Sequence, residues 1–140
     1  MTPAVLLDTG PLVALLLVQD GHHDWAKARF PEVAAPMLTC EAVLAEAGHL
    51  LRKVQRGPQA VMEMLRRGVI ALPFHVAEHV DAVAALMAKY RDLPMSVADA
   101  CLVRMSELHD PCAVLTMDSH FRVYRRHGRH VIPTIMPDSV

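Results

Sequence analysis

Short apolar runs alternate along the chain with longer stretches whose apolar residues recur at helical spacing. Runs bounded by turn residues predict β-strands at residues 4–7, 69–72, 113–115 and 131–135. Helical spacing and capping residues predict helices over residues 12–18, 22–30, 40–54, 59–67, 75–90 and 97–108. Strands that alternate with helices indicate a parallel sheet covered on both faces. The pattern therefore predicts an α/β fold.

Four acidic residues lie within or at the end of apolar stretches, where carboxylates are rare. Asp8 and Asp118 directly follow β-like runs, so we expect them at the carboxyl edge of the sheet, where open α/β folds bind ligands. Glu46 and Asp99 lie on predicted helices with apolar residues three or four positions away, which predicts that both point inward. An uncompensated carboxylate in apolar surroundings is costly. The four positions therefore predict one shared pocket that holds a divalent metal ion.

Each of these acids also has a purely structural interpretation. Asp8 and Asp118 can cap the helices that follow them, and Asp99 stands three residues after Ser96, which is the spacing of a capping box. Glu46 lies in the middle of its helix, where partial exposure at the edge of the packed face would explain it. The two interpretations are compatible, because a capping carboxylate can still reach a metal ion.

A site built from carboxylates without paired His or Cys suits Mg²⁺ or Mn²⁺ rather than zinc. These ions bind phosphate and serve in phosphodiester hydrolysis, so the expected substrate is a nucleic acid. Residues 119–130 support this substrate, because they contain no acid and four arginines: Arg122, Arg125, Arg126 and Arg129. A basic stretch beside an acidic metal site can hold a polyanion for cleavage. The alternative for this stretch is a solvated helix face.

Composition limits the class and the location of the protein. With 140 residues and a mass of 15.5 kDa, the chain is expected to form a single domain over residues 1–140. Its hydrophobic fraction of 53% indicates surface buried in an oligomer or against a partner. A net charge of −1 means that any nucleic-acid binding must come from local patches. Three cysteines without a C-x-x-C spacing, no basic leader and no apolar run of membrane length predict a cytoplasmic protein without a membrane segment.

Four segments resemble the successive motifs of PIN-domain ribonucleases, and most closely the VapC-like toxins of type II toxin–antitoxin systems. They are VLLDTGPL at residues 5–12, VLAEA at 43–47, PMSVADA at 94–100 and LTMDSHF at 115–121. The resemblance implies a three-layer α/β/α fold with a central, mainly parallel sheet. It also implies metal-dependent endoribonuclease activity with Mg²⁺ or Mn²⁺, an RNA substrate, a homodimer and a cognate antitoxin protein.

The resemblance assigns roles to six residues. It implies that four acids form the catalytic site: Asp8, Glu46, Asp99 and Asp118. Asp8, Asp99 and Asp118 would bind the metal ion, and the hydroxyl groups of Ser96 and Thr116 would support them. Glu41 competes with Glu46, although the first turn of a helix suits an exposed acid that the helix dipole stabilises. Asp92, near the third motif, reads as a turn residue.

Two other functions compete with this interpretation. Residues 75–79 match the H-x-x-E-H pattern of a zinc peptidase, with His75, Glu78 and His79 on one helix. A PIN-like fold can also bind RNA or a protein partner without cutting, because fold does not determine function. Zinc content would identify the peptidase, and metal-dependent RNA cleavage would exclude the non-catalytic module.

Overall fold

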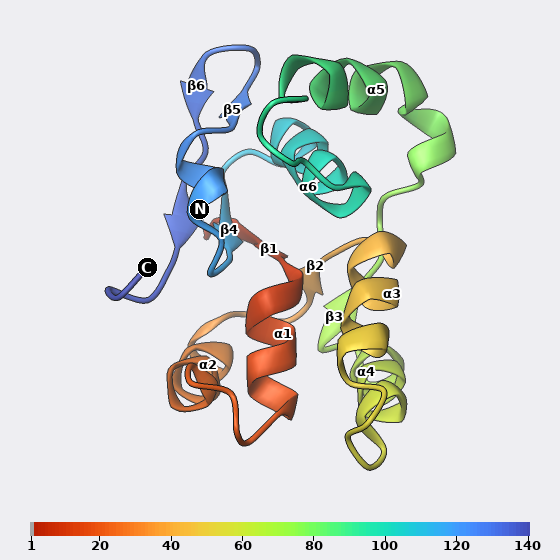
Figure 1. Cartoon of the computed structure of the whole chain (residues 1–140), viewed down its shortest axis with the longest axis vertical. Helices are drawn as coiled ribbons and strands as arrows, with labels where there is room; N and C mark the ends of the chain where they lie inside the picture. Colours follow the sequence, from red (N-terminus) through yellow and green to blue (C-terminus); the bar gives the residue numbers. More distant parts are fainter. Residues whose placement is uncertain (1) are drawn as a thin grey trace.

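A five-stranded parallel sheet forms the centre of the computed structural model, which describes residues 2–140 (Figure 1). The strand order is β3-β2-β1-β4-β7, and each neighbouring pair is parallel. These strands are β1 (Ala4–Leu7), β2 (Met37–Leu38), β3 (Ile70–Ala71), β4 (Cys112–Leu115) and β7 (Thr134–Ile135). A separate antiparallel hairpin consists of β5 (Arg125–Arg126) and β6 (His130–Val131). Residue 1 of the expected domain lies outside the described residues.

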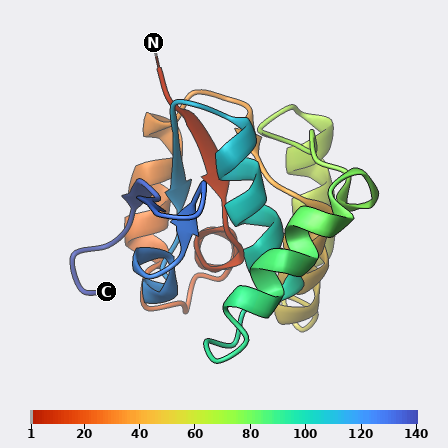
Figure 2. The same cartoon turned by 90° about the horizontal axis from the view of Figure 1, so that it is seen from above.

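Helices cover the sheet on both sides. They are α1 (Thr9–Leu16), α2 (His23–Arg29), α3 (Glu41–Leu50), α4 (Gly57–Arg66), α5 (Val80–Lys89) and α6 (Val97–Leu108). Helices α1 and α2 pack together on one side, and α5 packs on α6 on the other, as Figures 1 and 2 show, while α3 contacts α1, α4 and α6. The predicted three-layer α/β fold with a mainly parallel sheet is confirmed. Within residues 2–140, no helix has the length and hydrophobicity needed to cross a membrane.

The central pair of strands determines where a ligand can bind. The register of β1 and β4 pairs Leu6 with Val114 and Leu7 with Leu115, so the residues that follow the two strands emerge side by side. The chain passes from β1 to β2 on one side and returns to β4 on the other, so the strand order reverses between β1 and β4. Open α/β sheets bind ligands in the crevice at such a reversal. Asp8 and Thr116 are the first residues beyond the two strands.

Three predicted elements differ from the structure. The helix predicted over residues 75–90 is divided into a 3₁₀ turn, η2 (Val76–Glu78), and α5, because His79 between them has a non-helical backbone (φ −132°, ψ 24°). The strand predicted over residues 131–135 is divided between β6 and β7, since Pro133 cannot donate to a continuous ladder. The helix predicted over residues 40–54 ends at Leu50, because the chain turns back there to begin α4.

Candidate active site

One open pocket of about 400 Å³ is lined by the side chains of all four predicted acids. Asp8 lies at the end of β1, Asp118 lies just beyond β4, Asp99 lies in the first turn of α6, and Glu46 lies in the middle of α3. The pocket opens at the carboxyl edge of the sheet, where the strand order reverses. The fold therefore brings together carboxylates that are spread from position 8 to position 118.

Asp8 is the most enclosed of the four, with 6% of its surface exposed. Its Oδ1 accepts a hydrogen bond from the backbone N–H of Thr9 at 2.8 Å and caps α1. Its Oδ2 accepts a hydrogen bond from Thr116 Oγ1 at 2.7 Å, and the same hydroxyl accepts one from the backbone N–H of Asp118 at 3.0 Å. The Thr116 hydroxyl thus links the two acids that follow the central strands.

Asp99 and Asp118 are also capping residues. Ser96 Oγ accepts from the Asp99 N–H and Asp99 Oδ2 accepts from the Ser96 N–H, both at 3.0 Å, which completes a capping box for α6. Asp118 begins the 3₁₀ turn η3 (Ser119–Arg122), where its Oδ1 accepts from the His120 N–H at 2.9 Å and lies 3.0 Å from His120 Nδ1. The capping role and the position in the pocket therefore belong to the same side chains.

Glu46 lies at the rim of the pocket, not on the packed side of α3. The sequence predicts that it points inward between Val43 and Leu50, but Glu46 is exposed and Leu50 is 51% exposed. This part of the prediction is wrong, because α3 packs through the side that carries Val43 and Ala47. Glu41 lines a different pocket, so Glu46 is the α3 acid that joins the cluster.

Burial and mutual repulsion make this pocket costly for ionised carboxylates. Burial raises the pKa of Asp8 to about 6; the hydrogen bonds from Thr116 and Thr9 oppose the rise, and the charges of Asp99 and Asp118 add to it. Burial also raises the pKa of Asp99, with added repulsion from Asp118 and Glu46. A bound cation would relieve this repulsion and favour the ionised forms.

The donor set fits a hard divalent cation, which prefers carboxylate, hydroxyl and water oxygens. Thr9 lines the pocket, and its buried Oγ1 has no hydrogen-bond partner in the part of the chain that the structure describes. The acids nevertheless stand apart: among residues 2–140, no three His, Cys, Asp or Glu side chains are grouped closely enough to enclose an ion. A hexahydrated ion such as Mg²⁺ tolerates this spacing, because it keeps several of its waters when carboxylates bind it.

A second hydroxyl beside the acids belongs to Tyr124, which the sequence does not single out. Tyr124 is fully buried, and its Oη has no hydrogen-bond partner among residues 2–140. Burial raises the pKa of this phenol, and the charges of Asp99 and Asp118 raise it further. One sequence signal could have revealed its burial: Phe121 and Tyr124 stand three residues apart in a polar stretch, and their rings pack with centroids 5.2 Å apart.

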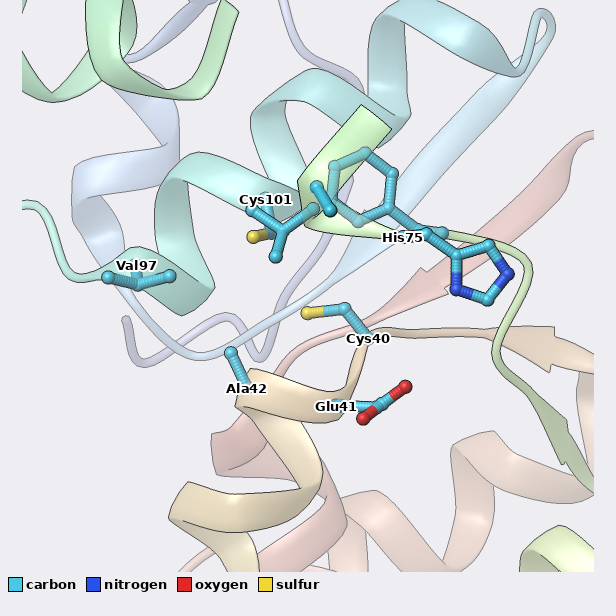
Figure 3. Close-up of a pocket in the computed structure, with 9 residues that line it drawn as sticks. Cys40, Glu41, Ala42, His75, Val97 and Cys101 are labelled. Atoms are coloured by element: carbon cyan, nitrogen blue, oxygen red, sulfur yellow. The ribbon is translucent and has the colours of Figure 1, made fainter. Parts of the chain in front are cut away.

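The zinc-peptidase motif is not assembled. His75 has extended backbone (φ −117°, ψ 108°) before η2, so His75 and His79 do not share a helix face. His75 lines a separate pocket of about 250 Å³, where its ring points away from the sulfur atoms of Cys40 and Cys101 (Figure 3). His79 instead stacks on Phe74 with ring centroids 4.8 Å apart. The zinc-peptidase alternative is therefore wrong, because the structure does not bring its two histidines together on one helix face.

Arg126, which the sequence predicts to contact nucleic acid, lies inside the protein. It is 8% exposed, and its guanidinium donates to the carbonyl oxygens of Ser106 and His109 and to the Asp110 carboxylate at 3.2 Å. These acceptors gather at the C-terminal end of α6, where helix carbonyl groups lack helical partners. Arg126 therefore has a structural role, and this corrects its assignment to the RNA-binding set.

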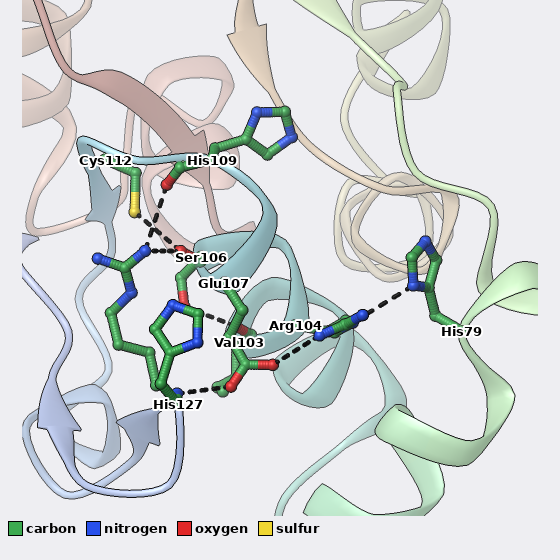
Figure 4. A network of polar contacts seen from close by, with 9 residues as sticks. His79, Val103, Arg104, Ser106, Glu107, His109, Cys112 and His127 are labelled. Atoms are coloured by element: carbon green, nitrogen blue, oxygen red, sulfur yellow. Dashed lines mark hydrogen bonds and ion pairs between the residues drawn. The ribbon is translucent and has the colours of Figure 1, made fainter.

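The rest of the basic stretch forms η3 and the β5–β6 hairpin rather than a helix face. Glu107 of α6 accepts from the His127 N–H at 2.6 Å and pairs with Arg104, which also donates to His79 (Figure 4). The His127 contact and those of Arg126 fix the hairpin to the C-terminal half of α6, about 10 Å or more along the helix from Asp99. The expectation that the whole stretch lies beside the acids is therefore wrong.

The remaining arginines of this stretch differ in exposure. Arg122 and Arg129 are exposed, and Arg122 donates to the carbonyl oxygen of Val140 at 2.6 Å. Arg125 is partly buried, and its Nη1 donates to three consecutive carbonyl oxygens, those of residues 122–124. Arg122 and Arg129 are therefore the side chains most available to a phosphate.

Comparisons with known proteins agree with this architecture. Among solved structures, the fold is similar to that of the Mycobacterium tuberculosis toxin VapC20, described as cleaving the sarcin–ricin loop, with a TM-score of 0.71 and 19% sequence identity over 83% of this chain and 91% of that one. No curated protein matches the chain significantly. The family model of the PIN domain matches residues 5–126, a span that contains all four carboxylates. The chain therefore belongs to the PIN-domain family.

Proposed function

We propose that this protein is a metal-dependent endoribonuclease that hydrolyses RNA phosphodiester bonds, and that it is the toxin of a toxin–antitoxin pair. One observation carries the proposal: four carboxylates from four elements line a single pocket at the strand-order reversal of a PIN-family sheet. The shared fold with VapC20, a toxin described by its RNA target, supports the choice of RNA over DNA.

Asp8, Asp99 and Asp118 are the proposed ligands of Mg²⁺ or Mn²⁺. When bound, the ion supplies an activated water and neutralises charge that develops on the phosphate. The Thr116 and Ser96 contacts hold the carboxylates of Asp8 and Asp99 in place, which reduces the reorganisation needed to bind the ion. Glu46 stands on the open side of the pocket, where it can orient the attacking water and accept its proton.

The proposed partners follow from charge and from the resemblance to toxins. Arg122 and Arg129 are the proposed phosphate contacts, because they are exposed while Arg126 is internal. A cognate antitoxin would offer a Lys or Arg side chain to the carboxylate cluster, where it could replace the cation. We further propose a cytoplasmic homodimer built from single-domain protomers, which light scattering coupled to size exclusion would test.

A non-catalytic module that binds RNA or a protein partner is the second candidate. The open spacing of the carboxylates is the observation in its favour, since no three of them enclose an ion in the described part of the chain. A module of this kind would bind RNA equally well in EDTA and in Mn²⁺ and would leave the RNA intact.

Cleavage assays with paired variants distinguish the two candidates. Purified protein is incubated with structured RNA, and with DNA of the same sequence, in Mg²⁺, Mn²⁺ or EDTA. We expect the wild type to cut RNA and to stop in EDTA, and Asp99→Asn and Glu46→Gln to lose cleavage while remaining folded. Glu41→Gln is the matched control on the same helix, and it should cleave normally because Glu41 lines another pocket. A folded Asp99→Asn protein that cleaves at the wild-type rate would contradict the proposal.

A further inference from the structure

Tyr124 is a buried polar residue that has no role in the proposed function. Its ring is completely enclosed and packs edge to face against Phe121, with centroids 5.2 Å apart, and against Tyr90, with centroids 5.1 Å apart. This packing fixes the direction of the phenol. The hydroxyl at its end has no hydrogen-bond partner within the described residues. A buried hydroxyl in this state lowers stability and calls for a physical explanation.

Tyr90, in the same aromatic cluster, has a hydroxyl with a hydrogen-bond partner and provides a comparison. Tyr90 Oη accepts a hydrogen bond from the backbone N–H of Arg125 at 2.9 Å. The two tyrosines thus share one aromatic cluster, but the Tyr90 hydroxyl has a backbone partner and the Tyr124 hydroxyl does not. Packing alone therefore explains the ring of Tyr124 and leaves its hydroxyl unexplained.

The surroundings of this hydroxyl are the carboxylates of the pocket. Burial raises the pKa of Tyr124; the charges of Asp99 and Asp118, a side-chain interaction with the Asp99 carboxylate and, more weakly, the charge of Asp8 raise it further. Tyr124 is buried and is not among the residues that line the pocket, so its hydroxyl would reach these acids from inside the protein. A protonated phenol can donate one hydrogen bond, and its nearest partners are strong acceptors. Asp99 has Oδ2 engaged by the Ser96 N–H and sits close to the phenol.

We propose that Tyr124 is a positioning residue of the metal site, whose hydroxyl donates to the Asp99 carboxylate from inside the protein and holds it toward a bound divalent cation. The inference rests on the proposed function, since it needs a cation in front of the carboxylates. A hydrogen bond from this direction orients a ligating carboxylate, and loss of such a contact typically lowers metal affinity by about 10–100-fold.

Two conservative variants test this inference. Tyr124→Phe removes the unpartnered hydroxyl, and Tyr90→Phe removes the bonded one from the same aromatic cluster. In EDTA, we expect Tyr124→Phe to melt at or slightly above the wild-type temperature, because no hydrogen bond is lost. Tyr90→Phe should melt lower, since the Arg125 N–H loses its acceptor.

In a titration with MnCl₂, we expect Tyr124→Phe to be the affected variant and Tyr90→Phe to be the unaffected one. We expect Tyr124→Phe to require about 10–100-fold more Mn²⁺ than the wild type for the same rise in melting temperature. Tyr90→Phe should follow the wild-type titration curve. The Mn²⁺ concentration for half-maximal RNA cleavage should shift by the same factor in Tyr124→Phe, while the rate at saturating Mn²⁺ stays close to that of the wild type.

The outcomes separate this inference from the proposed function. A Tyr124→Phe protein with the wild-type Mn²⁺ titration, or one that melts lower in EDTA with an unchanged metal response, would overturn the inference and leave the nuclease proposal intact. A wild-type protein whose melting temperature ignores Mn²⁺ would overturn both the metal site and the positioning role. A rightward shift confined to Tyr124→Phe would support the inference.

Discussion

Replacing Asp8 by Asn should stabilise the metal-free protein while removing its response to metal. Asp8 is buried beside other carboxylates, and its pKa is raised from 3.8 to about 6. The folded state therefore binds a proton more tightly than the unfolded state does. Ionised Asp8 consequently reduces the free energy of unfolding when the pH is above about 6, and this cost disappears as the pH falls toward 4.

The size of the effect follows from the pKa shift. The rise in the Asp8 pKa from 3.8 to about 6 corresponds to about 3 kcal/mol, and Asn avoids this cost because it carries no charge. Asn can still accept from the Thr9 N–H and bond to the Thr116 hydroxyl, but these neutral bonds are weaker by about 1 kcal/mol in total. The net gain is about 2 kcal/mol, which raises the melting temperature of a domain of this size by about 5 °C.

Thermal melts followed by circular dichroism test this expectation. Wild type and Asp8→Asn are compared in EDTA at pH 8 and at pH 5, and then at pH 8 with millimolar Mn²⁺. The variant should melt higher at pH 8, lose most of its advantage at pH 5, and gain nothing from Mn²⁺, whereas the wild type gains stability through binding. Asp92→Asn, in an exposed turn, is the control and should change nothing. An Asp8→Asn protein that melts below the wild type at pH 8 would show that Asp8 serves only as a helix cap.

Three further substitutions test the polar contacts around the site, the packing of the hairpin and the proposed RNA contact. Thr116→Val removes the donor to Asp8 and the acceptor of the Asp118 N–H, so urea denaturation should show a loss of about 2 kcal/mol in the free energy of unfolding. Unchanged stability would mean that water replaces the hydroxyl. Arg126→Met leaves the α6 carbonyl groups without their donor and should cost about 3 kcal/mol in the same assay. Arg129→Gln should instead keep its stability within about 0.5 kcal/mol. It should lower the salt dependence of RNA binding by about one unit, as fluorescence anisotropy can measure. Equal stability of the two arginine variants would contradict the internal role of Arg126.

The parts of the fold that local sequence signals determine were predictable. Strands β1 and β4 appear as short apolar runs, and the Ser96 to Asp99 spacing marks the start of α6, which the structure confirms as a capping box. The break before α5 was not predictable, because residues 75–79 fit a helical pattern. The break occurs at His79, whose ring stacks on Phe74 and whose Nδ1 accepts from Arg104, and the Arg104 contact requires α6 to be in place.

The pocket, like the fold, was predictable only in part. Two acids that follow parallel strands must meet at one sheet edge, so the proximity of Asp8 and Asp118 follows from the sequence pattern. The exposure of Glu46 depends on which side of α3 its neighbours cover, and apolar spacing alone could not decide this. The burial of Arg126 could not be predicted from the sequence, because a run of basic residues does not reveal that one of them binds carbonyl groups at the C-terminal end of α6. Tyr124 was not predicted either, because one aromatic residue in a polar stretch does not reveal which acids the fold places near its hydroxyl.

The central position of β1 has a consequence for how the protein is made. Strand β1 is synthesised before both of its neighbours: β2 follows from Met37, but β4 begins only at Cys112. Until β4 is synthesised, Leu6 and Leu7 lie along an open strand edge, which invites pairing with other chains. Fragments that end before β4 should therefore aggregate. They also carry Asp8 without Asp118, so a nascent or truncated chain cannot assemble the four-carboxylate pocket before residue 118 has been made.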